Sequence, residues 1–141
     1  MFSKKHSKPQ TQIDSLIGAN TVIGGDLNFS GGLRIDGQVN GNVIATQGKP
    51  STLVLSEQAQ VNGEVSVTHL VINGTINGSV SASEYLELQN KAKVSGDVHY
   101  KTIEIQLGAI VDGRLLHNTA GAEEKVLAFK ADSGELSRSA K

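Results

Sequence analysis

The chain has 141 residues, a formal net charge of −1 and no cysteine. The length predicts one domain, and the lack of cysteine excludes a disulfide scaffold, thiol catalysis and cysteine-bound zinc. No stretch approaches the roughly 18 apolar residues of a membrane span, and no apolar signal-peptide region follows the N-terminus. The overall charge gives no nucleic-acid signature, so we expect no nucleic-acid partner. The lack of a signal-peptide region argues against secretion, so we expect a cytoplasmic protein.

Charge divides the chain into three parts. Residues 1–12 contain Lys4, Lys5 and Lys8 and no acidic residue. Residues 13–117 carry six basic and ten acidic side chains, and residues 118–141 carry four of each. We therefore expect a disordered basic arm over 1–12, a folded domain over 13–117 and a polar tail, disordered or with a short helix, over 118–141.

The arm carries a minimal signal for binding a membrane surface. Each of its three lysines contributes about 1 kcal/mol near anionic lipid. Burial of Phe2 adds ~1.5–3 kcal/mol. One chain would bind weakly and reversibly, whereas an assembly that presents many arms would bind tightly. The alternative is a solvated, flexible terminus without a partner.

From residue 17 onward, every second residue is apolar or glycine over long stretches. Six such rows begin at positions 17, 33, 53, 70, 86 and 103. A period of two predicts strands with one dry face, and repetition at a regular spacing predicts stacked units. The sixth row predicts that alternate side chains face inward: Ile103, Ile105, Leu107, Ala109, Val111, Gly113, Leu115 and His117.

The connections between rows identify the type of stack. Most rows are separated by two or three residues, too few for a crossover helix, and parallel strands cannot be joined by hairpins. The chain therefore reaches the next layer by completing a turn of about 16–18 residues, as in a β-solenoid. Residues 46–52 form the one long loop. The repeated glycine of each row fits where the coil bends and the lumen is narrow. Antiparallel hairpins at Asn73-Gly74 and Asn77-Gly78 are the alternative, which the regular recurrence disfavours.

Four glycine motifs give the chain a family resemblance. They are Ile35-Asp-Gly-Gln-Val-Asn-Gly-Asn-Val43, Val61-Asn-Gly-Glu-Val65, Ile76-Asn-Gly-Ser-Val80 and Val94-Ser-Gly-Asp-Val98. With these motifs in sequence, residues 13–117 resemble the bactofilins, and Met1-Phe-Ser-Lys-Lys5 resembles the membrane-targeting start of many members. The resemblance implies a right-handed parallel β-helix of three short faces. It also implies nucleotide-independent polymerisation into cytoskeletal filaments at the bacterial inner membrane. Cell-wall enzymes or other scaffold clients are the partners it implies, and Met1, Phe2, Lys4, Lys5 and Lys8 the membrane-binding residues.

The ends of such a solenoid are the candidate polymerisation surfaces. An uncapped end exposes unpaired strand edges around an apolar lumen, which pair with another chain unless they are covered. The candidate interface residues are Ile13, Leu16, Ile17, Ile23, Ile110, Val111, Leu115 and Leu116. Leu116 breaks the parity of its row, so it points outward or marks where the chain leaves the coil. Like ends meeting give a nonpolar filament and unlike ends a polar one; the resemblance favours the nonpolar form.

Tails that fold back as caps are the alternative to open ends. Residues 123–130 contain Val126, Leu127 and Phe129, which one or two helical turns would bring together. In that case the chain would be a non-polymerising solenoid that serves as a binding module.

Members of the family that the chain resembles often carry an aromatic residue where this chain has Ile110 and Val111. The resemblance therefore does not identify which residue anchors the C-terminal end.

We expect no enzymatic activity, metal or cofactor. The four histidines are His6, His69, His99 and His117, and no two have the i, i+4 spacing of a helical metal site. We interpret them as surface or structural side chains, with His99 facing outward. The carboxylates do not converge, and Glu57 and Asn90 are expected on bulged corners. The long loop lacks the histidine that hexapeptide acyltransferases use.

Overall fold

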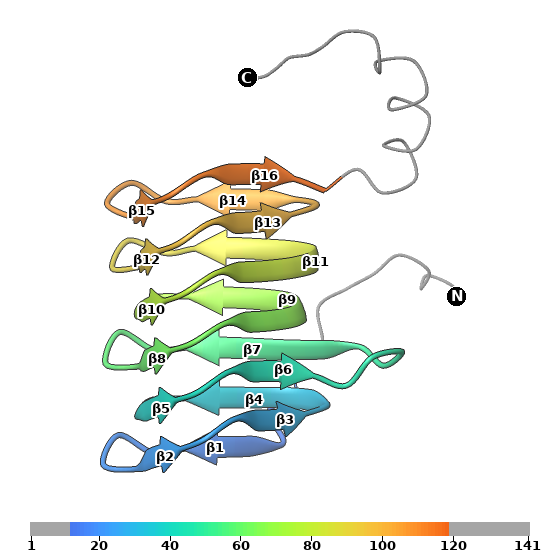
Figure 1. The fold of residues 1–141 in the computed structure, drawn as a ribbon, viewed down its shortest axis with the longest axis vertical. Coiled ribbons are helices and arrows are strands. Elements are labelled where there is room, and N and C mark those ends of the chain that lie inside the picture. The colour runs from blue at the N-terminus through green and yellow to red at the C-terminus, as the bar shows by residue number, and fades with distance from the viewer. Residues whose placement is uncertain (1–11, 119–141) are drawn as a thin grey trace, which may run out of the picture.

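The computed structural model describes residues 12–118 of the chain, and these form a parallel β-solenoid of six coils. All pairings between its strands are parallel; for example, Ser15 lies beside Leu33 in one pair and Val98 beside Leu115 in another. The parallel pairing rules out the antiparallel hairpins considered for the Asn-Gly pairs. The described residues contain no helix, and Figure 1 shows the coils as layers stacked along one axis.

Each coil has three short strands or strand segments, one on each face of the rod. Face 1 contains β1 Ser15–Ile17, β4 Gly31–Ile35, β7 Ser51–Leu55, the end of β9 Val65–Ile72, the end of β11 Val80–Leu88 and β14 Ile103–Ile105. Face 2 contains β2 Val22–Gly24, β5 Gln38–Asn40, β8 Gln60–Asn62, β10 Thr75–Asn77, β12 Lys93–Ser95 and β15 Ile110–Asp112. Face 3 contains β3 Leu27–Phe29, β6 Val43–Ala45, the starts of β9 and β11, β13 Val98–Tyr100 and β16 Leu115–His117.

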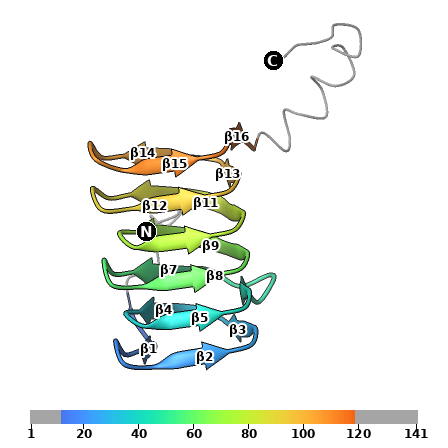
Figure 2. The same cartoon turned by 60° about the vertical axis from the view of Figure 1, so that its left-hand side comes forward.

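The coils are numbered here in chain order. They comprise residues 15–29, 31–45, 51–67, 69–82, 85–100 and 103–117. In Figure 2 the near strands β2, β5 and β8 run to the right while the colour rises from blue to red, so the winding is right-handed. The fold class predicted from the sequence is therefore confirmed.

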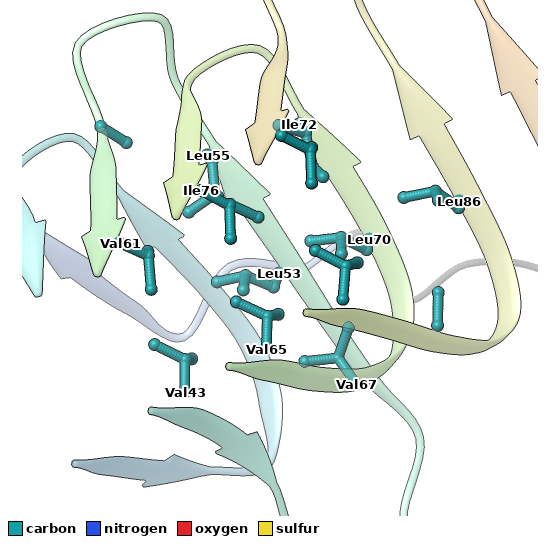
Figure 3. Packing of buried hydrophobic residues seen from close by; sticks show 14 of the residues in the cluster. Val43, Leu53, Leu55, Val61, Val65, Val67, Leu70, Ile72, Ile76 and Leu86 are labelled. Carbon is teal, nitrogen blue, oxygen red and sulfur yellow. The ribbon is translucent and has the colours of Figure 1, made fainter. Parts of the chain in front are cut away.

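The core is a continuous column of aliphatic side chains. Within residues 12–118, twenty apolar residues are buried, and all of them lie between Leu33 and Val98, that is, in coils 2 to 5. In Figure 3 side chains such as Leu53, Leu70 and Ile76 point into the space enclosed by the three faces. Leu53 lies beside Leu70, and Leu70 beside Leu86, because the registers place like residues directly over one another. Each coil therefore buries its apolar face only with a neighbour on both sides.

The corner between faces 1 and 2 explains two wrong details of the sequence interpretation. This turn has two residues in coils 2 and 4 but four residues in coils 1, 3, 5 and 6. The two additional residues shift the first row, so that Ile17 pairs with Ile35 and Ser15 takes the place opposite Leu33. The same extension places Leu107 outside the lumen, where its side chain is 96% exposed. Glu57 and Asn90 lie exposed in these turns, as predicted.

The corner between faces 2 and 3 is a column of six glycines. A Cβ atom on Gly41 would overlap the backbone carbonyl of Gly25 in the coil before it. The same holds for Gly63 over Gly41, and for the further members Gly78, Gly96 and Gly113. The glycines do lie where the coil bends, but the predicted reason, a narrow lumen, is wrong. They are needed because the backbones of successive coils approach one another along the rod axis.

Candidate assembly surfaces at the two ends of the rod

Both ends of the rod expose residues that are buried in the coils between them. Val111 lies directly over Val94 in one column, yet Val94 is fully buried and Val111 only partly. At the other end Ile23 lies beside Val39 in the same way, and Val39 is fully buried. The inward side chains of the end coils lack a neighbouring coil on one side among residues 12–118. We call these two surfaces the N-terminal mouth and the C-terminal mouth.

The N-terminal mouth is lined by Ile17, Ile23, Leu27 and Phe29, which all pack against the core on one side only. Outside this ring lie Leu16 at 59%, Val22 at 60% and Ile13 at 41% exposure. The sequence had identified Ile13, Leu16, Ile17 and Ile23. Leu27 and Phe29 were not predicted as interface residues, although their even spacing from Ile23 and Gly25 was a usable signal. Val22 was not predicted either, because side chains at outward positions were expected to be polar.

The C-terminal mouth is lined by Ile103, Ile105, Val111 and Leu115. Ile105 is 48% and Leu115 43% exposed, although both point toward the lumen axis. Two further apolar residues, Leu107 and Ile110, lie on the outside of this coil and are exposed. Among the predicted residues, Val111 and Leu115 thus line the mouth, whereas Ile110 lies on the outer side of face 2.

Leu116 lies on the outer side of face 3, as the break in parity indicated. It pairs with His99, whose side chain also faces outward, and it is half-buried in a shallow hollow that Ser81 helps to line. His117 lies over Tyr100, with the ring centroids 5.3 Å apart, and its Nε2 is 3.0 Å from the carbonyl oxygen of Lys101. His117 is nevertheless exposed, because no coil follows it among the described residues.

Exposed apolar side chains are confined to the ends of the rod. The seven large hydrophobic residues that are exposed within residues 12–118 all lie in coil 1, in coil 6 or just before coil 1. The first outward position of face 2 makes the contrast clear. It holds Val22 in coil 1 and Ile110 in coil 6, but the four coils between them carry Gln38, Gln60, Thr75 and Lys93. Apolar exposure at a rim typically marks an interaction surface.

A surface charged pair links the last coil to the one before it, in addition to the strand pairing. The Arg114 guanidinium donates to Asp97 with an Nη2–Oδ2 distance of 2.8 Å, and the Arg114 backbone N–H donates to Asp97 Oδ1 at 3.1 Å. Hydrogen bonds from the Arg114 side chain and backbone hold the pKa of Asp97 below its usual value, and the same pair raises the pKa of Arg114. Coil 6 is therefore held against coil 5 on one side, while its other side forms the open, apolar C-terminal mouth.

The sides of the rod are polar and hydrogen-bonded from coil to coil. Asn62 Nδ2 donates to Asn40 Oδ1 at 2.8 Å, and Asn77 Nδ2 donates to Asn62 Oδ1 at 2.8 Å. We call this series of hydrogen bonds along face 2 the asparagine ladder. On face 1 the Tyr85 hydroxyl donates to Glu104 Oε1 at 2.8 Å. Partial burial, followed by the Glu104 hydrogen bond, raises the pKa of Tyr85 to about 12.

The described residues offer no grouping of His, Asp and Glu side chains that would hold a metal ion. His69 is buried at the corner between faces 3 and 1, while His99 is exposed. Within residues 12–118 there is also no helix suited to crossing a bilayer. The predicted membrane-binding residues Met1, Phe2, Lys4, Lys5 and Lys8 lie outside the described residues, and so do residues 123–130, the cap considered as the alternative to open ends.

Comparison with known proteins identifies relatives of the same architecture. The family model described as "Bactofilin: Polymer-forming cytoskeletal" matches residues 15–116, which covers all six coils. The chain is 25% identical to Bactofilin BacP of Myxococcus xanthus over 116 residues, or 82% of this chain and 47% of BacP. It is 26% identical to Bactofilin BacO of the same organism over 102 residues, or 72% of this chain and 78% of BacO. The chain thus spans about half the length of BacP. No solved structure matches it significantly.

Proposed function

The chain belongs to the bactofilin family of polymer-forming cytoskeletal proteins, and on that premise we propose that it assembles end to end, without nucleotide, into filaments on the cytoplasmic side of the membrane. The observation that carries the proposal is the confinement of exposed large hydrophobic residues, among residues 12–118, to the two ends of the rod. Stacking the mouths would give each end coil the second neighbour that coils 2 to 5 already have. The filament would then serve as a scaffold for cell-shape or cell-wall machinery.

The chemistry of the mouths supports assembly without a nucleotide. The lining residues are aliphatic apart from Phe29, and the strands of coils 1 and 6 have one unpaired backbone edge among the described residues. Burial of apolar surface and completion of strand pairing both favour association directly. The joint would therefore need no bound phosphate or metal ion to hold it.

The interface residues of this proposal are Ile17, Ile23, Val111 and Leu115 inside the mouths, with Ile13, Leu16, Ile110 and Leu116 at their rims. A charged side chain inside a mouth would be buried without a partner in a joint, at a cost of several kcal/mol. Leu115→Arg should therefore leave a folded, dispersed protein. Sedimentation of this variant and of the unmodified chain, each without nucleotide, tests the proposal. Equal pelleting of the two proteins would show that the C-terminal mouth is not a joint.

Membrane association is the second part of the proposal and is based on the sequence of the arm. Phe2 with Lys4, Lys5 and Lys8 gives one chain a weak affinity for anionic lipid. A filament would display many arms at once, so its affinity would rise by avidity. Phe2→Glu should release filaments from anionic liposomes in a flotation assay without changing their pelleting. Unchanged flotation of this variant would remove Phe2 from the account.

A further inference from the structure

The glycine column contains one member that has no axial backbone contact within the described rod. Gly41, Gly63, Gly78, Gly96 and Gly113 each lie over the backbone of the preceding coil, so a Cβ atom on any of them would overlap that backbone. The would-be Cβ of each points toward the N-terminal end of the rod. Gly25 continues the column into coil 1, the first coil of the described residues, and apart from its chain neighbours none of those residues lies within 4 Å of its would-be Cβ.

The surroundings of Gly25 are equally bare. Its neighbour Gly24 pairs with Asn40 and takes the place that Asn40, Asn62 and Asn77 occupy in the ladder. Apart from its chain neighbours, no part of residues 12–118 lies within 4 Å of a Cβ atom on Gly24 either. At this corner of the N-terminal mouth the backbone is therefore not covered by any side chain, and the preceding residues are the exposed Val22 and the half-buried Ile23.

We infer that the Gly24–Gly25 corner is a contact of the filament joint, where the backbone of a second copy of this chain lies close against Gly25. Within the rod, glycine at this corner accompanies close axial approach of another backbone. The inference rests on the proposed end-to-end assembly and adds the contact by which the N-terminal mouth would take part in it. It does not depend on whether the second copy presents its like or its unlike end.

Backbone strain at Gly25 has to be separated from contact. Gly25 has a φ of +133°, a conformation that favours glycine whether or not a partner is present. Gly48 in the loop between β6 and β7 is a matched control, since its φ is +84° and no described residue lies within 4 Å of its would-be Cβ. Gly18 is a second control in the same coil. Its counterparts Asp36 and Ser56 carry side chains within the stack, and its own Cβ position is equally uncrowded.

The experiment compares Gly25→Ala, Gly48→Ala and Gly18→Ala in the full chain. Circular dichroism and thermal melting report the fold, and sedimentation with negative-stain microscopy reports assembly. We expect Gly48→Ala and Gly18→Ala to form filaments like the unmodified chain, and Gly25→Ala to stay in the supernatant with a β-rich spectrum. Filaments of Gly25→Ala that pellet as the unmodified chain does would overturn the inference and leave the proposed function standing. Absence of filaments from the unmodified chain would contradict the proposed function itself.

A second measurement keeps the test decisive if Gly25→Ala does not fold. The chain has no cysteine, so Ile23→Cys and Gln47→Cys each introduce a single thiol, in the N-terminal mouth and in the exposed loop. Maleimide labelling of preformed filaments is normalised to the urea-unfolded chain. We expect the labelling rate at position 23, relative to that at position 47, to fall about tenfold or more from protein dispersed at low concentration to filaments, because a joint shields it beyond its burial in the rod. A smaller fall would mean that the N-terminal mouth is open in the filament and would overturn the inference.

Discussion

Val94 and Val111 are one coil apart in the same column, and only the coil that follows Val94 makes their environments different. Arginine at position 94 would lie in the dry column and should prevent folding. Arginine at position 111 would lie at the open edge, where a long side chain reaches water by leaving the mouth. We therefore predict that Val111→Arg folds. It should not assemble, because a joint would bury the charged side chain without a partner.

Val71→Arg is the matched control for Val111→Arg. Val71 lies half-buried on the outer side of face 1 in coil 4, next to Glu87 in the following coil. Sedimentation of the two variants should place Val71→Arg in the pellet and Val111→Arg in the supernatant. If both lost assembly, a lateral contact rather than an end-to-end joint would hold the filament together.

A pair of leucines tests the assignment of core and surface. Leu70 is fully buried and Leu107 is 96% exposed. Leu70→Ala should lower the free energy of unfolding by about 2–5 kcal/mol, because it leaves a cavity between two stacked coils. Leu107→Ala should change it by no more than ~0.5 kcal/mol. Urea unfolding of dispersed protein, for example in a Val111→Arg background, measures both; a large loss in Leu107→Ala would contradict the exposed turn.

The asparagine ladder predicts a smaller, additive contribution. Asn62 donates to Asn40 and accepts from Asn77 and from Gln60, so Asn62→Ala removes three side-chain hydrogen bonds. With ~0.5–1.5 kcal/mol for a typical net hydrogen bond, and less at an exposed position, we expect a loss of about 1 kcal/mol. Asn28→Ala, on the outer side of β3, is the control. Equal unfolding free energies for the two variants would mean that the ladder does not stabilise the stack.

Tyr85 gives a prediction about pH. The pKa of Tyr85 is raised to about 12, so the protonated phenol is favoured in the folded state. Its contribution to stability is complete below the unfolded pKa near 10 and is lost as the pH rises through the folded value. In Tyr100→Phe, which leaves one tyrosine, absorbance titration should give a midpoint near 12 when folded and near 10 in denaturant. A folded midpoint near 10 would contradict both the partial burial of Tyr85 and its hydrogen bond to Glu104.

The sequence predicted the fold because side-chain parity and unit spacing are both local properties. Alternation identified inward positions such as Leu53 and Leu70, and short linkers required parallel coils. Parity failed at the corner between faces 1 and 2, because turns of two and of four residues both occur along the rod and the difference does not change parity. The first row was therefore misplaced by two residues, and Leu107 was assigned to the lumen.

The candidate surfaces were predicted only in part, for a related physical reason. An inward side chain is buried only if another coil packs over it. Alternation in the sequence shows the inward direction but not whether such a coil is present. Val111 and Leu115 were identified because they end the last row. Val22 and the bare Gly24–Gly25 corner stand out only when coil 1 is compared with the coils stacked on it.

Fibre diffraction from oriented filaments tests the central claim, that the rods stack along their own axis, most directly. Six coils at about 4.8 Å each predict a strong meridional reflection near 4.8 Å and an axial subunit repeat of about 29 Å, or about twice that if neighbours alternate in direction. A 4.8 Å reflection on the equator, or a subunit repeat unrelated to the height of six coils, would contradict end-to-end assembly.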